Sequence, residues 1–150
     1  MNCILKKFDD LTIDELYGIL KLRAEIFVVE QDCPYQDLDG KDQYSYHLFF
    51  EDNGEIIAYL RILPENVSYE DMAIGRVIVK KSYRGQGISR KLMKKAIDFI
   101  IIDLNKTKIR LSGQDYLEDY YTSFGFRKVS DCYLEDGIPH FEFLMENIRN

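Results

Sequence analysis

The sequence has few of the residues that build disulfide frameworks and metal centres. Its three cysteines, Cys3, Cys33 and Cys132, lie far apart, with no Cys-x-x-Cys pair and only two histidines in the chain. An odd and scattered set of cysteines argues against disulfides, and so few histidines argue against structural zinc. We therefore expect neither a disulfide nor a metal site.

Long apolar runs and an excess of positive charge are also missing. No segment approaches the roughly 20 apolar residues that cross a bilayer, and Asp9 and Asp10 stand where a signal peptide needs its apolar region. The net charge of -6 argues against general nucleic-acid binding, because such binding needs a basic surface. These absences predict a cytoplasmic protein that binds neither membrane nor nucleic acid.

The chain does have enough apolar sequence for one core. With 46% hydrophobic and 13% aromatic residues, its 150 residues suffice for one well-covered domain and are too few for two. We find no internal repeat, low-complexity tract or linker. A single domain over residues 1–150 is expected.

Hydrophobic periodicity and turn residues predict the order of the elements. Thr12 and Glu15 form a capping-box pattern, which marks the start of a helix, and Asn53-Gly54 supplies the positive φ angles of a tight hairpin turn. The expected elements are a strand at 3–5, a helix from 12 with its apolar stripe reaching 27, an ordered loop at 30–44, strands at 46–50, 56–63 and 72–79, a helix at 88–104, a strand at 108–111, a short helix at 117–124, and strands at about 127–134 and 141–146 around a turn at 135–137.

A basic segment follows the strand at 72–79. Between Lys80 and Lys95 there are seven basic residues and no acidic one, for which a solvated helix face is the alternative reading. Gly85 and Gly87 stand between this strand and the next helix, where glycine lets the backbone approach a ligand and the helix amides attract anions. The turn lacks the lysine-serine ending of a P-loop and the third glycine of a dinucleotide fingerprint. A nucleotide triphosphate and NAD are therefore disfavoured, and another ligand with a pyrophosphate is predicted.

Two motifs carry a resemblance to a known family. Arg84-Gly85-Gln86-Gly87-Ile88-Ser89 resembles the Gln/Arg-x-x-Gly-x-Gly/Ala signature of the GCN5-related N-acetyltransferases (GNAT family), and residues 121–126 (YTSFGF) resemble that family's Tyr-x-x-x-Gly-Phe. Ser89 departs from the family's glycine or alanine, and its hydroxyl could donate to a phosphate oxygen. Residues 23–33 (RAEIFVVEQDC), 34–35, 39–40, 75–77 (GRV) and 136–140 (DGIPH) are similar to the ElaA-like branch, so the resemblance covers essentially the whole chain.

The resemblance implies a fold, a cofactor and a reaction. The fold is α/β (α+β), a single domain with a central mixed, mostly antiparallel sheet of about seven strands flanked by about four helices. The reaction is transfer of an acetyl group from acetyl-CoA to a primary amine of a small molecule or a peptide, by direct attack on the thioester. The cofactor-binding residues implied are Val77, Ile78, Val79, Arg84, Gly85, Gln86, Gly87, Ile88, Ser89, Arg90, Gln114 and Tyr121.

The same resemblance suggests the catalytic groups. The backbone N–H of Val79 is the candidate for the developing oxyanion, and Tyr121 is the candidate general acid, with core packing as its alternative. Gln114 either contacts the cofactor or caps the following helix. The general base stays open between Glu30, His47, His140 and ordered water.

Other charged residues have structural alternatives. Arg23 and Arg76 are expected to be partners of the acids in the loop at 30–44, and those acids together with Glu30 could attract a cationic amine. The acceptor itself is not predicted, because its specificity would reside in this loop and in the turn at 135–140.

Because no base is evident, a second hypothesis is a catalytically silent acyl-CoA-binding sensor or interaction module. A modifier of tRNA or protein is a third, which the acidity of the chain argues against. The oligomeric state is left open, a homodimer included.

Overall fold

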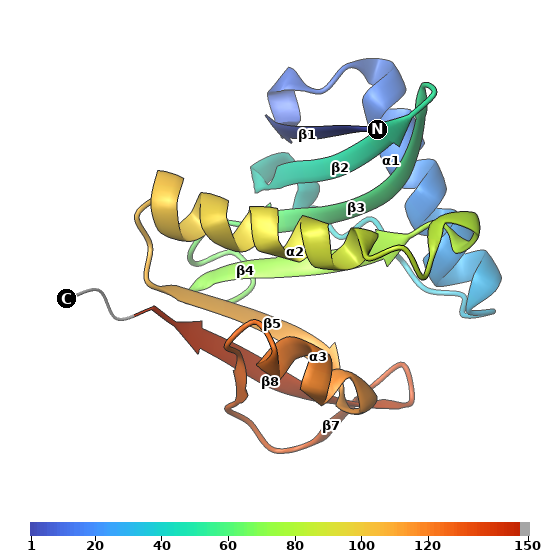
Figure 1. Cartoon of the computed structure of the whole chain (residues 1–150). Helices are drawn as coiled ribbons and strands as arrows, with labels where there is room; N and C mark the ends of the chain where they lie inside the picture. Colours follow the sequence, from blue (N-terminus) through green and yellow to red (C-terminus); the bar gives the residue numbers. More distant parts are fainter. Residues whose placement is uncertain (148–150) are drawn as a thin grey trace.

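The computed structural model describes residues 1–147, which form an α+β fold with an eight-stranded sheet and three α-helices (Figure 1). The fold class implied by the motifs is confirmed. The elements are β1 (Asn2–Lys7), α1 (Ile13–Arg23), β2 (Tyr46–Asp52), β3 (Glu55–Leu63), β4 (Met72–Val79), α2 (Ile88–Asp98), β5 (Lys108–Gln114), α3 (Glu118–Thr122), β6 (Arg127–Lys128), β7 (Tyr133–Glu135) and β8 (Ile138–Glu146).

The sheet has the strand order β1-β2-β3-β4-β5-β8-β6, and β7 pairs with β8. All neighbouring strands are antiparallel except β4 and β5. These two are parallel because α2 crosses over between them, as parallel strands require. The sheet is therefore mixed and mostly antiparallel.

Two helices cover opposite faces of the sheet (Figure 1). Alternate residues of a strand point to opposite faces. Phe49 and Tyr59 accordingly pack with Ile19 of α1 in one cluster, whereas Leu60 packs with Leu92 of α2 in the other. Both clusters are closed to solvent, so the sheet is held from both sides.

The helix boundaries follow the capping signals. Thr12 Oγ1 accepts from the Glu15 amide at 3.0 Å, and the Glu15 carboxylate accepts from the Thr12 amide at 2.9 Å, so the predicted capping box is confirmed. Beyond α1 the main chain widens into π-helical turns at Ala24–Glu30, and α2 continues in the same way at Phe99–Asp103. No helix in the described part of the chain is long and apolar enough to cross a membrane.

β4 carries an irregularity that opens the middle of the sheet. Arg76 has φ of 55°, and the pairing of β3 with β4 shifts here, from Arg61 opposite Gly75 to Tyr59 opposite Ile78. One more residue of β4 than of β3 lies in this interval, which is a β-bulge. β4 pairs with β5 only at Met72 and Ala73, so the two strands separate towards their carboxyl ends.

The end of the chain differs from the expectation in one respect. The single strand predicted at about 127–134 is wrong: β6 and β7 are separate strands, and β8 begins at residue 138 instead of 141. Between β6 and β7 the chain leaves the strand pairing with β8. There the Ser130 hydroxyl, not a backbone carbonyl, accepts a hydrogen bond from the Glu142 amide at 2.9 Å. The turn is confirmed, with Asp136 and Gly137 at positive φ between β7 and β8.

Candidate active site

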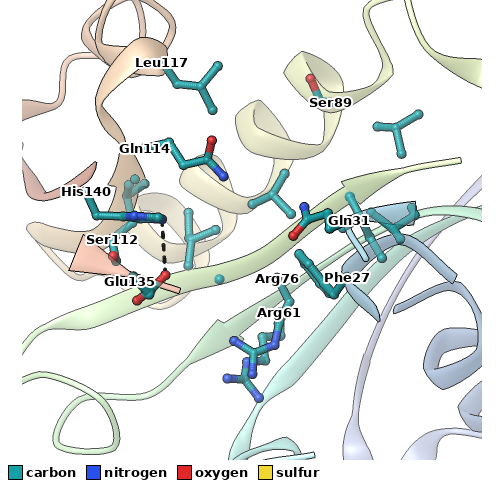
Figure 2. Close-up of a pocket in the computed structure, with 18 of the residues that line it drawn as sticks. Phe27, Gln31, Arg61, Arg76, Ser89, Ser112, Gln114, Leu117, Glu135 and His140 are labelled. Atoms are coloured by element: carbon teal, nitrogen blue, oxygen red, sulfur yellow. Dashed lines mark ion pairs between the residues drawn. The ribbon is translucent and has the colours of Figure 1, made fainter. Parts of the chain in front are cut away.

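A cavity of about 1250 Å³ lies in the gap between the separating ends of β4 and β5 (Figure 2). Its walls come from distant parts of the chain: the π-helical segment after α1, the loop at 31–41, the glycine turn before α2, the start of α3, and the β7–β8 turn. Most of the candidates that the sequence indicates lie on these elements, whereas His47 lies on β2, away from the cavity.

The edge of β4 presents the free backbone amide of Val79 to this cavity. The amide of Lys80 donates to the carbonyl of Ile57 on β3, so the groups of the adjacent Val79 point away from β3. Because β5 has already diverged, the Val79 N–H faces the gap, and Val77 has the same orientation by strand alternation. An extended ligand could pair here as an added strand would.

The glycine turn has the geometry that anion binding requires. Gly85 and Gly87 have φ of 79° and 74°, which favour glycine, and Gly87 is the N-cap of α2. A Cβ on either would meet no atom within 4 Å, so the space in front of the backbone is open. Gly85, Gly87, Ile88 and Ser89 line the cavity with the amino end of an 11-residue helix, which fits a pyrophosphate. Gln86 and Arg90 do not line it.

The side chains of Ser89 and Arg90 are used to bind α3. Ser89 Oγ lies 2.9 Å from the hydroxyl of Tyr120. The Arg90 guanidinium lies 4.8 Å from the ring centre of Phe124 and 5.3 Å from that of Tyr120, and it donates to Ser123 Oγ. Both residues therefore join α2 to α3, and Ser89 lines the cavity as well.

Arg84 connects the glycine turn to two other parts of the site. Its Nη atoms donate to both carboxylate oxygens of Glu30 at 2.7 and 2.6 Å, and its Nε donates to the Val79 carbonyl at 2.9 Å. The hydrogen bonds from Arg84 lower the pKa of Glu30, which makes this carboxylate a weaker proton acceptor. Glu30 is thus the partner of Arg84, and it does not line the cavity.

Tyr121 lines the cavity and is 8% exposed. The ring packs 5.1 Å from that of Phe143 and against Gly113, where a Cβ would lie 2.5 Å from Tyr121 Cε2. Burial raises the pKa of Tyr121 to about 12, with smaller contributions from Tyr120 and Tyr116. No described residue hydrogen-bonds its hydroxyl. Because its pKa is raised, the hydroxyl keeps its proton at neutral pH.

The two histidines have different positions. His47 is fully buried away from the cavity, between the Tyr59 hydroxyl and the Asp42 carbonyl, and burial lowers its pKa. His140 lines the cavity: Nδ1 donates to the Ile138 carbonyl at 2.7 Å, because that oxygen only accepts, and Nε2 lies 3.2 Å from Glu135 Oε2. Among the candidate bases, His140 alone lines the cavity, and both of its ring nitrogens have partners there.

Gln114 is the last residue of β5 and precedes the short turn before α3. Its side chain makes no capping hydrogen bond. Figure 2 shows the amide projecting toward the middle of the cavity, on the side opposite Gln31. The capping alternative is therefore not observed, and the amide is available to a ligand.

A network of arginines and aspartates supports one wall of the cavity. Arg23 binds Asp37 and Asp42 at 2.9 and 2.8 Å, and Arg76 binds Asp37 at 2.8 Å, so both are partners of the loop acids as predicted. Burial would raise the pKa of Asp42, but the hydrogen bond and charge of Arg23 outweigh it and the pKa is lowered. These contacts fix the loop over β3 and β4.

Arg61 was missed by the sequence interpretation. It joins the same network through Asp39 and Asp42, and it is 3% exposed. Its one signal in the sequence is that it is the charged residue inside the apolar run from 56 to 63.

Comparisons with known proteins agree with this geometry. Residues 15–147 match the family model described as an acetyltransferase (GNAT) domain. Protein ElaA of Escherichia coli is 40% identical over 142 residues, 93% of each chain, and a UPF0039 protein of Schizosaccharomyces pombe is 42% identical over 97% of each. The structure of an acyl-CoA N-acyltransferase from Pseudomonas aeruginosa superposes with a TM-score of 0.92 at 40% identity, covering 96% of this chain and 98% of that one.

Proposed function

This chain belongs to the acetyltransferase (GNAT) family, and we propose that it is an acetyl-CoA-dependent N-acetyltransferase acting on a primary amine of a small molecule or a peptide. One observation carries the proposal. A free strand edge at Val79, an open glycine turn at a helix start, and the protonated phenol of Tyr121 all face one cavity. These three features match the three parts of a CoA ester. The glycine turn suits its pyrophosphate, the strand edge suits its pantetheine arm, and the phenol suits the sulfur of its thioester.

The residues that line the cavity offer a contact to each part of the cofactor. The amides of residues 87–89 would hold the pyrophosphate, the β4 edge would pair with the pantetheine arm, and Gln114 would contact it from β5. When bound, acetyl-CoA supplies an acyl carbon activated by its thioester.

The chain's own groups then handle charge and protons. The Val79 N–H would donate to the carbonyl oxygen as negative charge develops there. The amine nitrogen forms its bond to the acyl carbon while the carbon–sulfur bond breaks. His140 Nε2 would take the proton that the amine loses, with Nδ1 held by Ile138, and Tyr121 would give its proton to the departing sulfur.

The test is a thiol-release assay with purified protein, acetyl-CoA and a panel of primary amines. We expect amine-dependent release of free thiol, lowered by about 10² to 10⁴ in kcat in Tyr121→Phe, because the general acid is lost. Tyr120→Phe is the matched control, since its hydroxyl faces Ser89 and should affect kcat little. No thiol above background from any amine, together with an unaffected Tyr121→Phe, would refute the proposal.

A silent acyl-CoA-binding module is the second candidate. It is favoured by the placement of the bases: His47 is buried elsewhere and Glu30 is bound by Arg84. Of these candidates only His140 lines the cavity, and its Nε2 lies against the Glu135 carboxylate. Saturable binding of CoA by calorimetry, with no turnover across the same amine panel, is the result that would select this candidate.

A further inference from the structure

The glycine turn already has an anion bound beside it, the carboxylate of Glu30. Arg84 lines the cavity together with Gly85 and Gly87, and its Nη atoms donate to both carboxylate oxygens of Glu30 at 2.7 and 2.6 Å. The hydrogen bonds from Arg84, and to a smaller extent the charge of Lys81, lower the pKa of Glu30. The carboxylate therefore carries its negative charge at neutral pH, next to the place proposed for the pyrophosphate.

The guanidinium of Arg84 also occupies the edge of β4. Its Nε donates to the Val79 carbonyl at 2.9 Å. This carbonyl points away from β3, because the amide of Lys80 donates to Ile57 on that strand. An extended ligand that paired with this edge would need the same carbonyl as an acceptor. Arg84 therefore covers a backbone acceptor of the site while it binds Glu30.

This ion pair can open at small cost. The side chains of Arg84 and Glu30 are 43% and 30% exposed, and ion pairs that water reaches contribute little to stability. A pyrophosphate carries more negative charge than one carboxylate, and it accepts the same charge-assisted hydrogen bonds from a guanidinium. Its proposed place, at the amides of residues 87–89, is three residues along the chain from Arg84. The guanidinium thus has two alternative anions to bind.

Glu30 can act on such a ligand only through Arg84. It is the last residue of the π-helical segment Ala24–Glu30, and it does not line the cavity, although its neighbours Phe27 and Gln31 do. The carboxylate is therefore placed to bind the guanidinium and not the ligand.

We propose that Glu30 is an internal competitor of the cofactor: it binds Arg84 in the free protein, and the pyrophosphate of acetyl-CoA displaces it from the guanidinium on binding. The inference rests on the proposed function for the identity of the ligand. Opening the ion pair subtracts from the affinity for CoA, as any binding-incompetent state of a site does. The same competition favours release of the product CoA after transfer.

The test is titration calorimetry of CoA with the wild type and with Glu30→Gln. We expect Glu30→Gln to lower the Kd of CoA by about threefold, the value of a partly exposed ion pair. Pantetheine, the part of CoA that carries no phosphate, should bind both proteins alike. An unchanged or higher Kd of CoA in Glu30→Gln, or an equal gain for pantetheine, overturns the competition.

Glu25→Gln is the matched control. Glu25 lies exposed on the same π-helical segment and forms no ion pair in the part of the chain that the structure describes, so its replacement removes the same charge without touching Arg84. It should leave the Kd of CoA as in the wild type. A gain in Glu25→Gln equal to that in Glu30→Gln would mean that net charge alone is responsible, and it overturns the competition.

A double-mutant cycle with Arg84→Gln tests whether the effect passes through the guanidinium. Arg84→Gln should weaken CoA binding at least about threefold, because a charge-assisted contact to the pyrophosphate is lost. In this background Glu30→Gln should change the Kd of CoA no further. A gain that persists without Arg84 would mean that the carboxylate repels the cofactor directly, which contradicts the exchange.

Thiol release by the same variants separates this inference from the proposed function. If Glu30→Gln binds CoA more tightly and no amine releases thiol, the competition stands and the transfer reaction fails. If thiol release depends on the amine and the Kd of CoA is the same in Glu30→Gln as in the wild type, the transfer reaction stands and the competition fails. No binding of CoA by any of these proteins overturns both.

Discussion

The absence of a side chain at Gly113 lets the Tyr121 ring lie directly against β5. A methyl group there would be 2.5 Å from Tyr121 Cε2 and 3.0 Å from Phe143 Cε2, both in rigid aromatic rings. We expect Gly113→Ala to lower the free energy of unfolding by about 1–3 kcal/mol and to lower kcat by displacing the phenol. Denaturant unfolding and thiol release measure both effects. A variant as stable and active as the wild type would show that Tyr121 tolerates displacement.

Ser89 is the residue at which the motif departs from its family, and its hydroxyl contacts Tyr120. We expect Ser89→Ala to lower the free energy of unfolding by about 0.5–1.5 kcal/mol, the value of one hydrogen bond, with CoA affinity nearly unchanged. A double-mutant cycle with Tyr120→Phe, followed by denaturant unfolding, isolates the pair. A large loss of CoA affinity in Ser89→Ala would instead assign the hydroxyl to the phosphates.

At the scale of elements, the capping box at the start of α1 is the most local signal that the structure retains. Thr12→Ala removes the acceptor for the Glu15 amide and should lower the free energy of unfolding by about 1 kcal/mol. For a domain of this size that corresponds to roughly 2–4 °C in Tm. Thr12→Ser keeps the hydroxyl and serves as the control; equal Tm values for the two variants would contradict the cap's contribution.

Elements with such local signals could be predicted from the sequence, and those set by distant contacts could not. The capping box, the Asn53-Gly54 turn and the glycine turn depend on neighbouring residues alone. The bulge at Arg76 depends on the register with β3, and the division of the strand at 127–134 depends on Glu142 binding Ser130. The π-helical turns after α1 likewise had no signal in the pattern of apolar residues.

The candidate site shows the same division. Tyr121, the Val79 edge and the glycine turn follow from motifs, because the fold brings motifs to fixed places. The pairing of Arg84 with Glu30 and the stacking of Arg90 on Phe124 join residues far apart in sequence, and no spacing predicts them. Arg61 is the clearest example, since its partners Asp39 and Asp42 lie about twenty residues away in the loop.

At the scale of the whole molecule, buried tyrosines set the response to alkaline pH. Burial raises the pKa of Tyr121 to about 12, whereas an unfolded tyrosine ionises near 10. Its contribution to stability is therefore complete below pH 10 and is lost as the pH rises toward 12, by about 2–3 kcal/mol. Tyr35 and Tyr69, whose pKa values burial also raises to about 12, should act in the same direction.

Urea unfolding at a series of pH values between neutrality and pH 12, with tyrosinate absorbance as a second probe, measures this loss. Tyr121→Phe should show a shallower decline than the wild type over the same interval, because the variant has no phenol to ionise at this position. Identical slopes would mean that Tyr121 ionises in the folded protein without cost.

The separation of β4 and β5 has a consequence for the solvent exchange of backbone hydrogens. The two halves of the sheet are joined at Met72 and Ala73 alone, and beyond them the Val77 and Val79 amides have no opposite strand. These amides should exchange with deuterium rapidly beside well-protected neighbours on β3, and slow down when an extended ligand pairs with them. Exchange at this seam can therefore identify a ligand of the protein before any product of its chemistry is known.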